Sequence, residues 1–434
     1  MLEGLNLARK FLSFLGTTDY KRCTYEYGDL EKEQCTTKFI QEALLKIFCK
    51  DWTEEDTAVI FLTEKAEKEN WYNEEDEERR LKVILDELNI KAKAVPIPEG
   101  KTEDEIWEIF NIVINEIDDG DEVIFDITHS FRSLPMLALV ILNYAKALKN
   151  IKLLGIYYGF FDPSASSNIM PIFDLTPLNL ILEWSHAVDI FLKYGISGPF
   201  RDISVEQLKP HLRSEQWARD TRQFIESLNN LTMCIYTCRG KALSGKGTDR
   251  RSISAAVEAV NNNIRNIKDI DEDIQLKPLV PLMEKIEKRL EIFDRNDNLN
   301  VGIAAVKWAM ENNLIQQAYT ALDETIKTYV CEKYGYDSSN VDHREKIVNK
   351  ALKIKAQDKR EEEWEVEKEY WEQVKELVGK LDKELANLSE NIGKFRNDIN
   401  HFGFSKDATR YTKLQSSIND FFKEFLAYID ADRQ

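Results

Sequence analysis

Four polar side chains near the carboxyl-terminal end of the chain have types and spacing suited to acid–base chemistry at a phosphate. They are Arg396, Asn397, Asn400 and His401. An arginine can stabilise negative charge that develops on a phosphate, and a histidine can transfer protons near neutral pH. Because so short a pattern also arises by chance, the residues alone leave an ordinary solvated helix end as the alternative.

A helix is expected to position these four side chains. Apolar residues recur at alternating steps of four and three, which predicts one buried stripe: Leu381, Leu385, Leu388, Ile392, Phe395, Ile399 and Phe402. The polar four lie off this stripe, so we expect them on the face turned away from the subunit's own core, with Gly403 ending the helix. Arg396 and His401 are five positions apart, at different angles around the helix. One copy is therefore not expected to close a site, whereas two facing copies could.

Polar residues also follow two predicted strands of the amino-terminal region. The turn Gly16-Thr17-Thr18 comes after the first, and the segment 128–133 follows another and enters an apolar helix. Ligands in open α/β sheets bind beyond the carboxyl ends of strands, where helix N-termini favour anions. The same pattern is also compatible with a capped helix that carries a surface arginine and a hydrogen-bonded histidine.

Short β-rich runs alternate with amphipathic stretches up to about residue 175, which predicts a Rossmann-like parallel sheet flanked by helices. Strands are predicted over 10–15, 58–63, 92–97, 122–127 and 152–158, with 169–173 as an extra edge, and helices over 36–48, 74–88, 103–117 and 134–148. Beyond Pro177 only helical patterning remains. We therefore predict an α/β domain over 1–177, a helical connecting domain over 178–300 and an all-helical domain over 301–434.

The composition restricts the possible partners. A formal net charge of -18, from 59 Lys plus Arg against 77 Asp plus Glu, disfavours an extended nucleic-acid surface and points to a small local site. The six cysteines form no paired C-x-x-C arrangement, so neither disulfides nor a metal site is expected. G-x-G-x-x-G and Walker motifs are missing, which argues against a nucleotide cofactor. Without a signal peptide or a membrane-spanning run, the protein is expected in the cytoplasm.

The amino-terminal motifs resemble the CARF family. The resemblance rests on DITHSFRSLPM from Asp126, LSFLGTTDY from Leu12 and IYYG from Ile156, and covers about the first 175 residues. It implies a sensor of the cyclic oligoadenylates made by type III CRISPR complexes, with two domains paired about a two-fold axis. The ligand contacts that it implies are Gly16, Thr17, Thr18, Thr128, His129, Ser130 and Arg132. Thr63 is added only because it ends the second strand.

The carboxyl-terminal motif resembles the HEPN ribonuclease family. R-N-D-I-N-H from Arg396 has the expected polar residue directly after the arginine, and the segment 308–320 is similar to an early HEPN helix. The resemblance implies metal-independent cleavage of single-stranded RNA by its own 2'-OH. His401 would act as acid or base, Arg396 would stabilise the pentavalent phosphate, and Asn397 and Asn400 would orient the groups.

Together these features predict a CRISPR-associated endoribonuclease activated by a cyclic oligoadenylate, with the tetramer favoured over the hexamer. The expected assembly is a homodimer or a higher homo-oligomer, with no membrane and no duplex DNA as partner. One alternative is a non-catalytic, ligand-gated regulator, although the acidic balance argues against a DNA-recognition helix. A ring nuclease that degrades the cyclic ligand is the other alternative.

Overall fold

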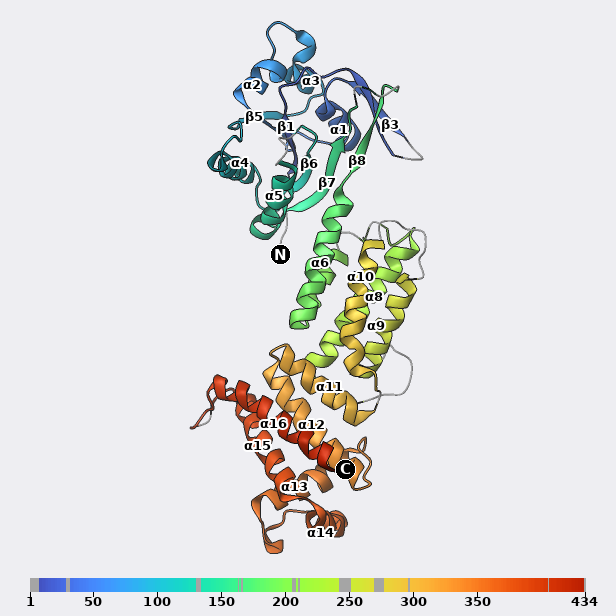
Figure 1. Ribbon diagram of the computed structural model, residues 1–434, viewed down its shortest axis with the longest axis vertical. Helices are drawn as coiled ribbons and strands as arrows, with labels where there is room; N and C mark the ends of the chain where they lie inside the picture. The colour runs from blue at the N-terminus through green and yellow to red at the C-terminus, as the bar shows by residue number, and fades with distance from the viewer. Residues whose placement is uncertain are drawn as a thin grey trace. The chain divides into compact units, whose positions relative to one another are not determined.

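The computed structural model describes residues 8–28, 32–129, 134–162, 164, 167–204, 208–209, 211–241, 251–268, 277–295, 297–404 and 406–432. The chain divides into two compact units, Met1–Leu180 and Ile181–Gln434. The first holds a mixed sheet with helices, and the second is helical (Figure 1). The predicted fold class, a Rossmann-like sheet domain followed by helical regions, is confirmed.

The elements of the first unit alternate between strands and helices, as the sequence predicts. They are β1 (Arg9–Leu15), β2 (Cys23–Tyr27), β3 (Glu33–Thr37), α1 (Ile40–Phe48), β4 (Thr57–Leu62), α2 (Glu64–Ala66), η1 (Glu67–Trp71), η2 (Glu77–Arg79), α3 (Leu81–Glu87), β5 (Ala92–Pro96), α4 (Glu103–Asn115), β6 (Glu122–Asp126), α5 (Leu134–Lys149), β7 (Lys152–Gly159) and β8 (Ile169–Asp174). Helix α6 (Thr176–Tyr194) follows β8.

One sheet organises the first unit. In the described residues its strand order is β3-β2-β8-β7-β6-β1-β4-β5. Strands β7, β6, β1, β4 and β5 run parallel, β8 is antiparallel to β7, and β2 and β3 form an antiparallel hairpin that extends the sheet through β8. Because β1 lies in the parallel part between β6 and β4, their three carboxyl ends meet at one edge of the sheet.

Helices cover both faces of the sheet (Figure 1). On one face, side chains such as Phe11 and Ile60 pack with α1 and α3. Alternate residues of the same strands, such as Leu12 and Phe61, pack with α4 and α5 on the other face. Strands buried on both sides must be apolar throughout, which is why the parallel strands were readable in the sequence.

Three predictions for the first unit are wrong. Segment 169–173 is not an edge, because the β2–β3 hairpin continues the sheet beyond β8. The helix predicted over 36–48 begins only at Ile40, since Thr36 and Thr37 pair with β2 instead. The helix predicted over 74–88 is likewise shorter and begins at Leu81, after a single 3-10 turn.

The described part of the second unit is built from helices alone. They are α7 (Gly198–Ile203), α8 (Gln216–Tyr236), α9 (Ile253–Lys268), η4 (Lys277–Leu279), α10 (Val280–Leu290), η5 (Glu291–Phe293), α11 (Asn298–Glu311), α12 (Ile315–Lys333), η6 (His343–Val348), α13 (Asn349–Gln357), η7 (Glu361–Glu363), η8 (Lys368–Tyr370), α14 (Trp371–Lys380), α15 (Lys383–Asn400) and α16 (Tyr411–Asp432).

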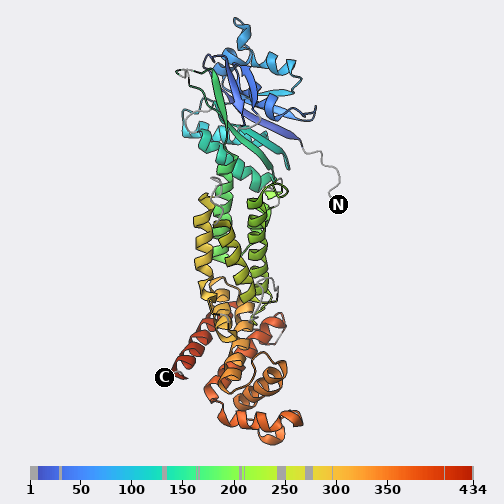
Figure 2. The same cartoon turned by 90° about the vertical axis from the view of Figure 1, so that its right-hand side faces the viewer.

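Helix α12 is the centre of the carboxyl-terminal packing. It contacts α11, α15 and α16, and its residues Leu322 and Ile326 share one apolar core with Ile392 of α15 and Phe425 of α16. Helices α8 and α9 lie side by side in both views (Figures 1 and 2). The unit covers both regions that we predicted as separate helical domains, and their boundary stays a prediction. Within the described ranges, no helix combines the length and apolar character needed to cross a membrane.

Candidate functional site

The first candidate site lies at the carboxyl ends of β1, β4 and β6. In the sheet Leu15 pairs with Leu62, and Ser13 pairs with Asp126. The residues that follow these three strands are therefore neighbours, although they lie far apart in the sequence. The structure brings together the turn after β1 and the segment after β6, as the sequence predicts for a site at a strand end.

The turn after β1 is held by side chains that fold back on its backbone. The Gly16 amide donates to the Tyr20 hydroxyl at 2.9 Å, and the Asn70 side-chain amide donates to the carbonyls of Gly16 and Thr18, each at 2.9 Å. A Cβ on Gly16 would lie 2.5 Å from the Tyr20 hydroxyl oxygen, so glycine lets the ring approach. Thr17 and Thr18 are exposed on this turn and can meet a ligand.

The segment after β6 contacts the same turn. The Thr128 amide donates to Asp126 at 2.9 Å, and the Thr128 hydroxyl accepts the Gly159 amide at 2.8 Å. The His129 ring stacks on Tyr20 with centroids 4.3 Å apart. Burial lowers the pKa of His129 from 6.5 to about 4, so its imidazole is neutral at physiological pH.

A buried carboxyl group braces the ends of β1 and β6 beneath this site. Asp126 is fully buried and accepts the Ser13 hydroxyl at 2.7 Å, and the Gln41 amide donates to that hydroxyl at 3.1 Å. Burial raises the pKa of Asp126, whereas the hydrogen bonds from Thr128 and Ser13 oppose that shift. Neither Asn70 nor Gln41 was among the predicted residues, because each acts across many positions of sequence.

The remaining predicted ligand contacts are Thr63, Ser130 and Arg132. The Thr63 hydroxyl accepts the Ala66 amide at 3.2 Å and so caps α2, and its side chain is buried. That bond accounts for its place at a strand end without a ligand. Ser130 and Arg132 lie outside the described residues.

The second candidate site lies where α15 packs on α12. Arg396 forms an ion pair with Asp323, which is buried at 4% exposure and also lies 3.4 Å from the Lys327 ammonium. The Asn400 side-chain oxygen accepts the Gln316 amide at 3.2 Å. Two of the four predicted catalytic side chains are thus held against a neighbouring helix of the same chain.

The prediction that all four residues face away from the subunit's own core is wrong for Arg396 and Asn400. Ile392, Arg396 and Asn400 step by four, so they share the side of α15 that packs on α12. Phe402 is not part of the apolar stripe either. The helix ends at Asn400, and Phe402 has a φ of 57°, which takes its ring out of the helical register and leaves it 87% exposed.

Arg396 and Asn397 line a polar cleft of about 390 Å³. Its walls include the lysines Lys327, Lys353 and Lys394 and come from α12, α13 and α15. The buried Arg396 Nε has no hydrogen-bond partner among the described residues. Four carboxylates line the same cleft and pair with its cations: Asp323, Glu324, Glu345 and Glu390.

His401 differs from Arg396 in its surroundings. It caps the end of α15, where its amide donates to the Asn397 carbonyl at 2.9 Å, and its side chain is exposed. No hydrogen bond of its imidazole is found within the described ranges, and neither His401 nor Asn400 lines the polar cleft. One chain therefore positions Arg396 firmly and leaves His401 open to a substrate or a second copy.

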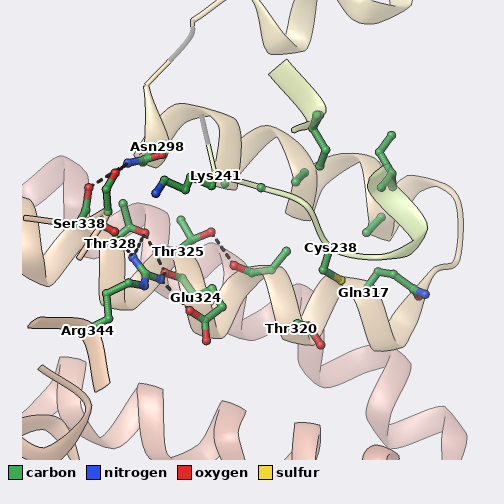
Figure 3. Close-up of a pocket in the computed structure, with 18 of the residues that line it drawn as sticks. Cys238, Lys241, Asn298, Gln317, Thr320, Glu324, Thr325, Thr328, Ser338 and Arg344 are labelled. Carbon is green, nitrogen blue, oxygen red and sulfur yellow. Dashed lines mark hydrogen bonds and ion pairs between the residues drawn. The ribbon is translucent and has the colours of Figure 1, made fainter. Parts of the chain in front are cut away.

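A charged network supports Arg396 from the other side of α12. The Arg344 guanidinium donates to the Glu324 carboxylate at 2.7 Å and to the Thr328 hydroxyl at 2.8 Å (Figure 3). Glu324 lies 2.8 Å from the Lys327 ammonium and 3.9 Å from Arg396. Burial alone would lower the pKa of Lys327, but Asp323 and Glu324 outweigh it and raise that pKa, so Lys327 stays charged.

Asp323 and Lys327 were missed in the sequence, although an acid and a base four residues apart on one helix are a visible signal. The cavity on the Arg344 side of this network has a volume of about 270 Å³ (Figure 3). Within the described ranges, no group of three or more His, Cys, Asp or Glu side chains could hold a metal ion.

The amino-terminal site can be compared with a known domain family. Residues 10–163 match the family model described as "CRISPR system endoribonuclease Csx1, CARF domain". This part of the chain is similar to a CARF domain. The match covers β1 to β7 and includes Gly16, Thr128 and His129, which meet at the sheet edge.

A curated relative extends the similarity beyond that domain. The chain is 30% identical over 318 residues to "CRISPR-associated protein MJ1674" of Methanocaldococcus jannaschii, an alignment that covers 70% of this chain. The aligned part is 46% of the relative, so the chain spans less than half of that protein's length. Together the two comparisons support a CRISPR-associated protein with a CARF domain.

Proposed function

We propose that this protein is a CRISPR-associated endoribonuclease that cleaves single-stranded RNA without a metal ion and is activated by a cyclic oligoadenylate. The observation that carries the ribonuclease part is Arg396. It is fixed by Asp323 at the edge of a polar cleft, five residues before the exposed His401. The similarity to a CARF domain supports the ligand, and the two sites lie in different compact units.

The residues near the end of α15 fit an in-line attack of the RNA 2'-OH on the adjacent phosphate. In this scheme His401 transfers the proton of the 2'-OH or donates one to the leaving 5'-oxygen. Arg396 stabilises the charge of the pentavalent phosphate. Asn397, beside it in the cleft, orients the phosphate. The products are a 2',3'-cyclic phosphate and a 5'-OH.

Asn400 has a more limited part in this scheme. Its side-chain oxygen is engaged by Gln316 of α12, which leaves the amide nitrogen to contact RNA or the second copy. Because His401 follows Asn400 directly, the same hydrogen bond also fixes the end of α15. We therefore assign Asn400 to positioning of His401.

The turn after β1 and the segment after β6 fit half of a symmetric cyclic ligand. Thr17 and Thr18 present exposed hydroxyls, and neutral His129 can exchange hydrogen bonds with an adenine or a ribose. Because the chain contributes one such half, a ring of repeating adenylates requires a second copy. Cyclic tetra-adenylate is the favoured activator and the hexamer is the second candidate.

An exposed apolar stripe on α5 supports a homodimer. Met136, Val140, Tyr144 and Leu148 step by four along this helix and are all exposed, with Met136 at 75%. A stripe of this kind on a helix that follows the sensor segment is best buried against another apolar surface. A second copy of the same domain provides such a surface.

The chemistry is tested by cleavage of a short single-stranded RNA in the presence of cyclic tetra-adenylate and excess EDTA. We expect undiminished cleavage and products that carry 2',3'-cyclic phosphate and 5'-OH ends. Products with a 3'-OH, or cleavage that chelation abolishes, would contradict the proposed mechanism. The His401→Ala protein, made in parallel, controls for a contaminating ribonuclease.

A further inference from the structure

Two phenylalanines are displayed on the turn that follows α15. Phe402 and Phe404 are 87% and 89% exposed, the two largest values among the exposed large hydrophobic side chains described. Complete burial of one such ring is worth about 1.5–3 kcal/mol, which this chain alone does not gain. The rings are therefore expected to contact something outside the chain.

The backbone holds these rings in a defined arrangement. Phe402 and Gly403 adopt φ values of 57° and 73°, and the turn is closed by hydrogen bonds from the Gly403 amide to the Asp398 carbonyl at 3.4 Å and from the Phe404 amide to the His401 carbonyl at 3.0 Å. Asp398 also accepts the Thr409 amide at 2.7 Å, which ties down the chain beyond the turn. The backbone that carries the two rings is thus held in place next to His401.

The spacing of the rings matches a sandwiched base. Their planes are within 22° of parallel and their centroids are 6.4 Å apart. Stacked bases in a nucleic acid strand are spaced by about 3.4 Å, so a flat base between two rings needs roughly twice that distance. Near-parallel ring pairs in this protein span a range of spacings, since the centroids of Phe48 and Tyr157 are 3.9 Å apart and those of Tyr158 and Phe173 are 6.4 Å apart.

The surrounding charge favours a polyanion. Lys406, Arg410 and Lys413 follow within ten residues of the turn and are exposed, and Tyr411 between them is 78% exposed. Within the described ranges, none of these three cations forms an ion pair. In a chain of net charge -18, a short segment that alternates aromatic and unpaired basic side chains is the pattern that binds single-stranded nucleic acid.

We propose that Phe402 and Phe404 clamp one unpaired RNA base next to the scissile phosphate, while Lys406, Arg410 and Lys413 hold the neighbouring phosphates. This inference rests on the proposed ribonuclease function and names the substrate feature that the site selects, an unstacked nucleotide. A base within a duplex cannot enter the clamp without leaving its stack, so single strands are preferred.

The test uses the full-length His401→Ala protein with cyclic tetra-adenylate, so that RNA binds without being cut. The probe is a short single-stranded RNA that carries 2-aminopurine, whose fluorescence is quenched when it stacks on an aromatic ring. We expect quenching, and we expect Phe402→Leu/Phe404→Leu to remove it and to weaken binding by roughly tenfold or more. Tyr194→Leu, at an exposed tyrosine outside the turn, should change neither.

Leucine separates base stacking from a protein contact, because it keeps apolar bulk but has no aromatic face. Unchanged quenching and affinity in the Phe402→Leu/Phe404→Leu protein would overturn the clamp. So would a Phe402→Ala/Phe404→Ala protein that loses its dimer in sedimentation, because the rings would then be covered by a second copy. Failure of wild type to cleave RNA with any cyclic oligoadenylate contradicts the ribonuclease function itself, whereas normal cleavage with these outcomes removes only the clamp.

Discussion

The edge of the sheet and the end of α15 differ in how firmly the rest of the chain holds their polar side chains. At the sheet edge the turn is held by contacts within the chain: Tyr20 bonds Gly16, Asn70 bonds two carbonyls, and the neutral His129 ring stacks on Tyr20. At the end of α15 Arg396 and Asn400 are held by α12, whereas His401 is exposed and has no side-chain hydrogen bond among the described residues.

This difference is consistent with a preformed ligand-binding site at the sheet edge and with a catalytic site on α15 that is complete only with a second copy or a substrate. A preformed turn binds a ligand with little loss of conformational entropy, which favours affinity. A half-formed catalytic pair has little activity until a second copy or a substrate completes it. Control of the second site by the first then requires only that ligand binding favours the paired state of the helices.

The comparison is tested most strongly at His401. We expect His401→Ala to lower the rate of RNA cleavage by roughly 100-fold or more, because the proton transfers lose their catalyst. Affinity for cyclic tetra-adenylate, measured by calorimetry, should stay at the wild-type value. His186→Ala, at an exposed histidine of α6, is the matched control and should cleave normally.

The second prediction concerns the support of Arg396. Asp323→Asn keeps the shape of the side chain but removes the carboxylate from Arg396 and Lys327, so Arg396 should lose its fixed position. We expect kcat to fall between about 10- and 100-fold with little change in KM, since misplaced groups cost rate more than affinity. Glu345→Gln makes the same exchange at a carboxylate that lies 3.2 Å from Lys327 and forms no ion pair with Arg396 among the described residues. Equal losses in both variants would reduce Asp323 to a stabilising residue.

The third prediction uses the neutral imidazole at the sheet edge. The pKa of His129 is about 4 in the folded protein and 6.5 in the unfolded chain, so the unfolded chain binds the extra proton between these values. The contribution of His129 to the free energy of unfolding is therefore complete above pH 6.5 and is lost as the pH falls toward 4. At pH 5 about 2 kcal/mol of it is lost. Urea unfolding at pH 7 and pH 5 measures this loss. In His129→Gln the loss should shrink by that amount, and an unchanged pH dependence would show that His129 is not buried.

The smallest effect is expected at Tyr20. Tyr20→Phe keeps the ring on His129 but removes the hydroxyl that accepts the Gly16 amide, which should cost about 1 kcal/mol of ligand affinity. Titration of cyclic tetra-adenylate against both proteins measures it. A gain in affinity would mean that the ligand displaces Tyr20 from the turn.

The sequence predicted the parallel strands of the sheet and missed the β2–β3 hairpin. Strands β1, β4 and β6 read clearly because both of their faces are buried, whereas β2 and β3 carry alternating polar residues such as Glu26 and Gln34 and resemble loops or helix starts. The end of the α15 stripe was misjudged for a related reason. A left-handed φ at a phenylalanine cannot be read from apolar spacing.

The candidate residues were found where a motif is local, and their partners were not. Gly16, Thr128 and His129 do meet at one edge, because parallel strands bring their carboxyl ends together. The bond between Arg396 and Asp323 joins residues 73 positions apart, and such a contact depends on how two helices pack. Contacts of that kind appear only once the fold is known.

The central claim is that a cyclic oligoadenylate switches on a ribonuclease built around Arg396. It is tested most directly by cleavage of single-stranded RNA by the wild-type and Arg396→Ala proteins, each with and without cyclic tetra-adenylate. We predict rapid cleavage only by wild type with the activator. Equal cleavage by both proteins, or wild-type cleavage that ignores cyclic tetra-adenylate and cyclic hexa-adenylate alike, would contradict the claim.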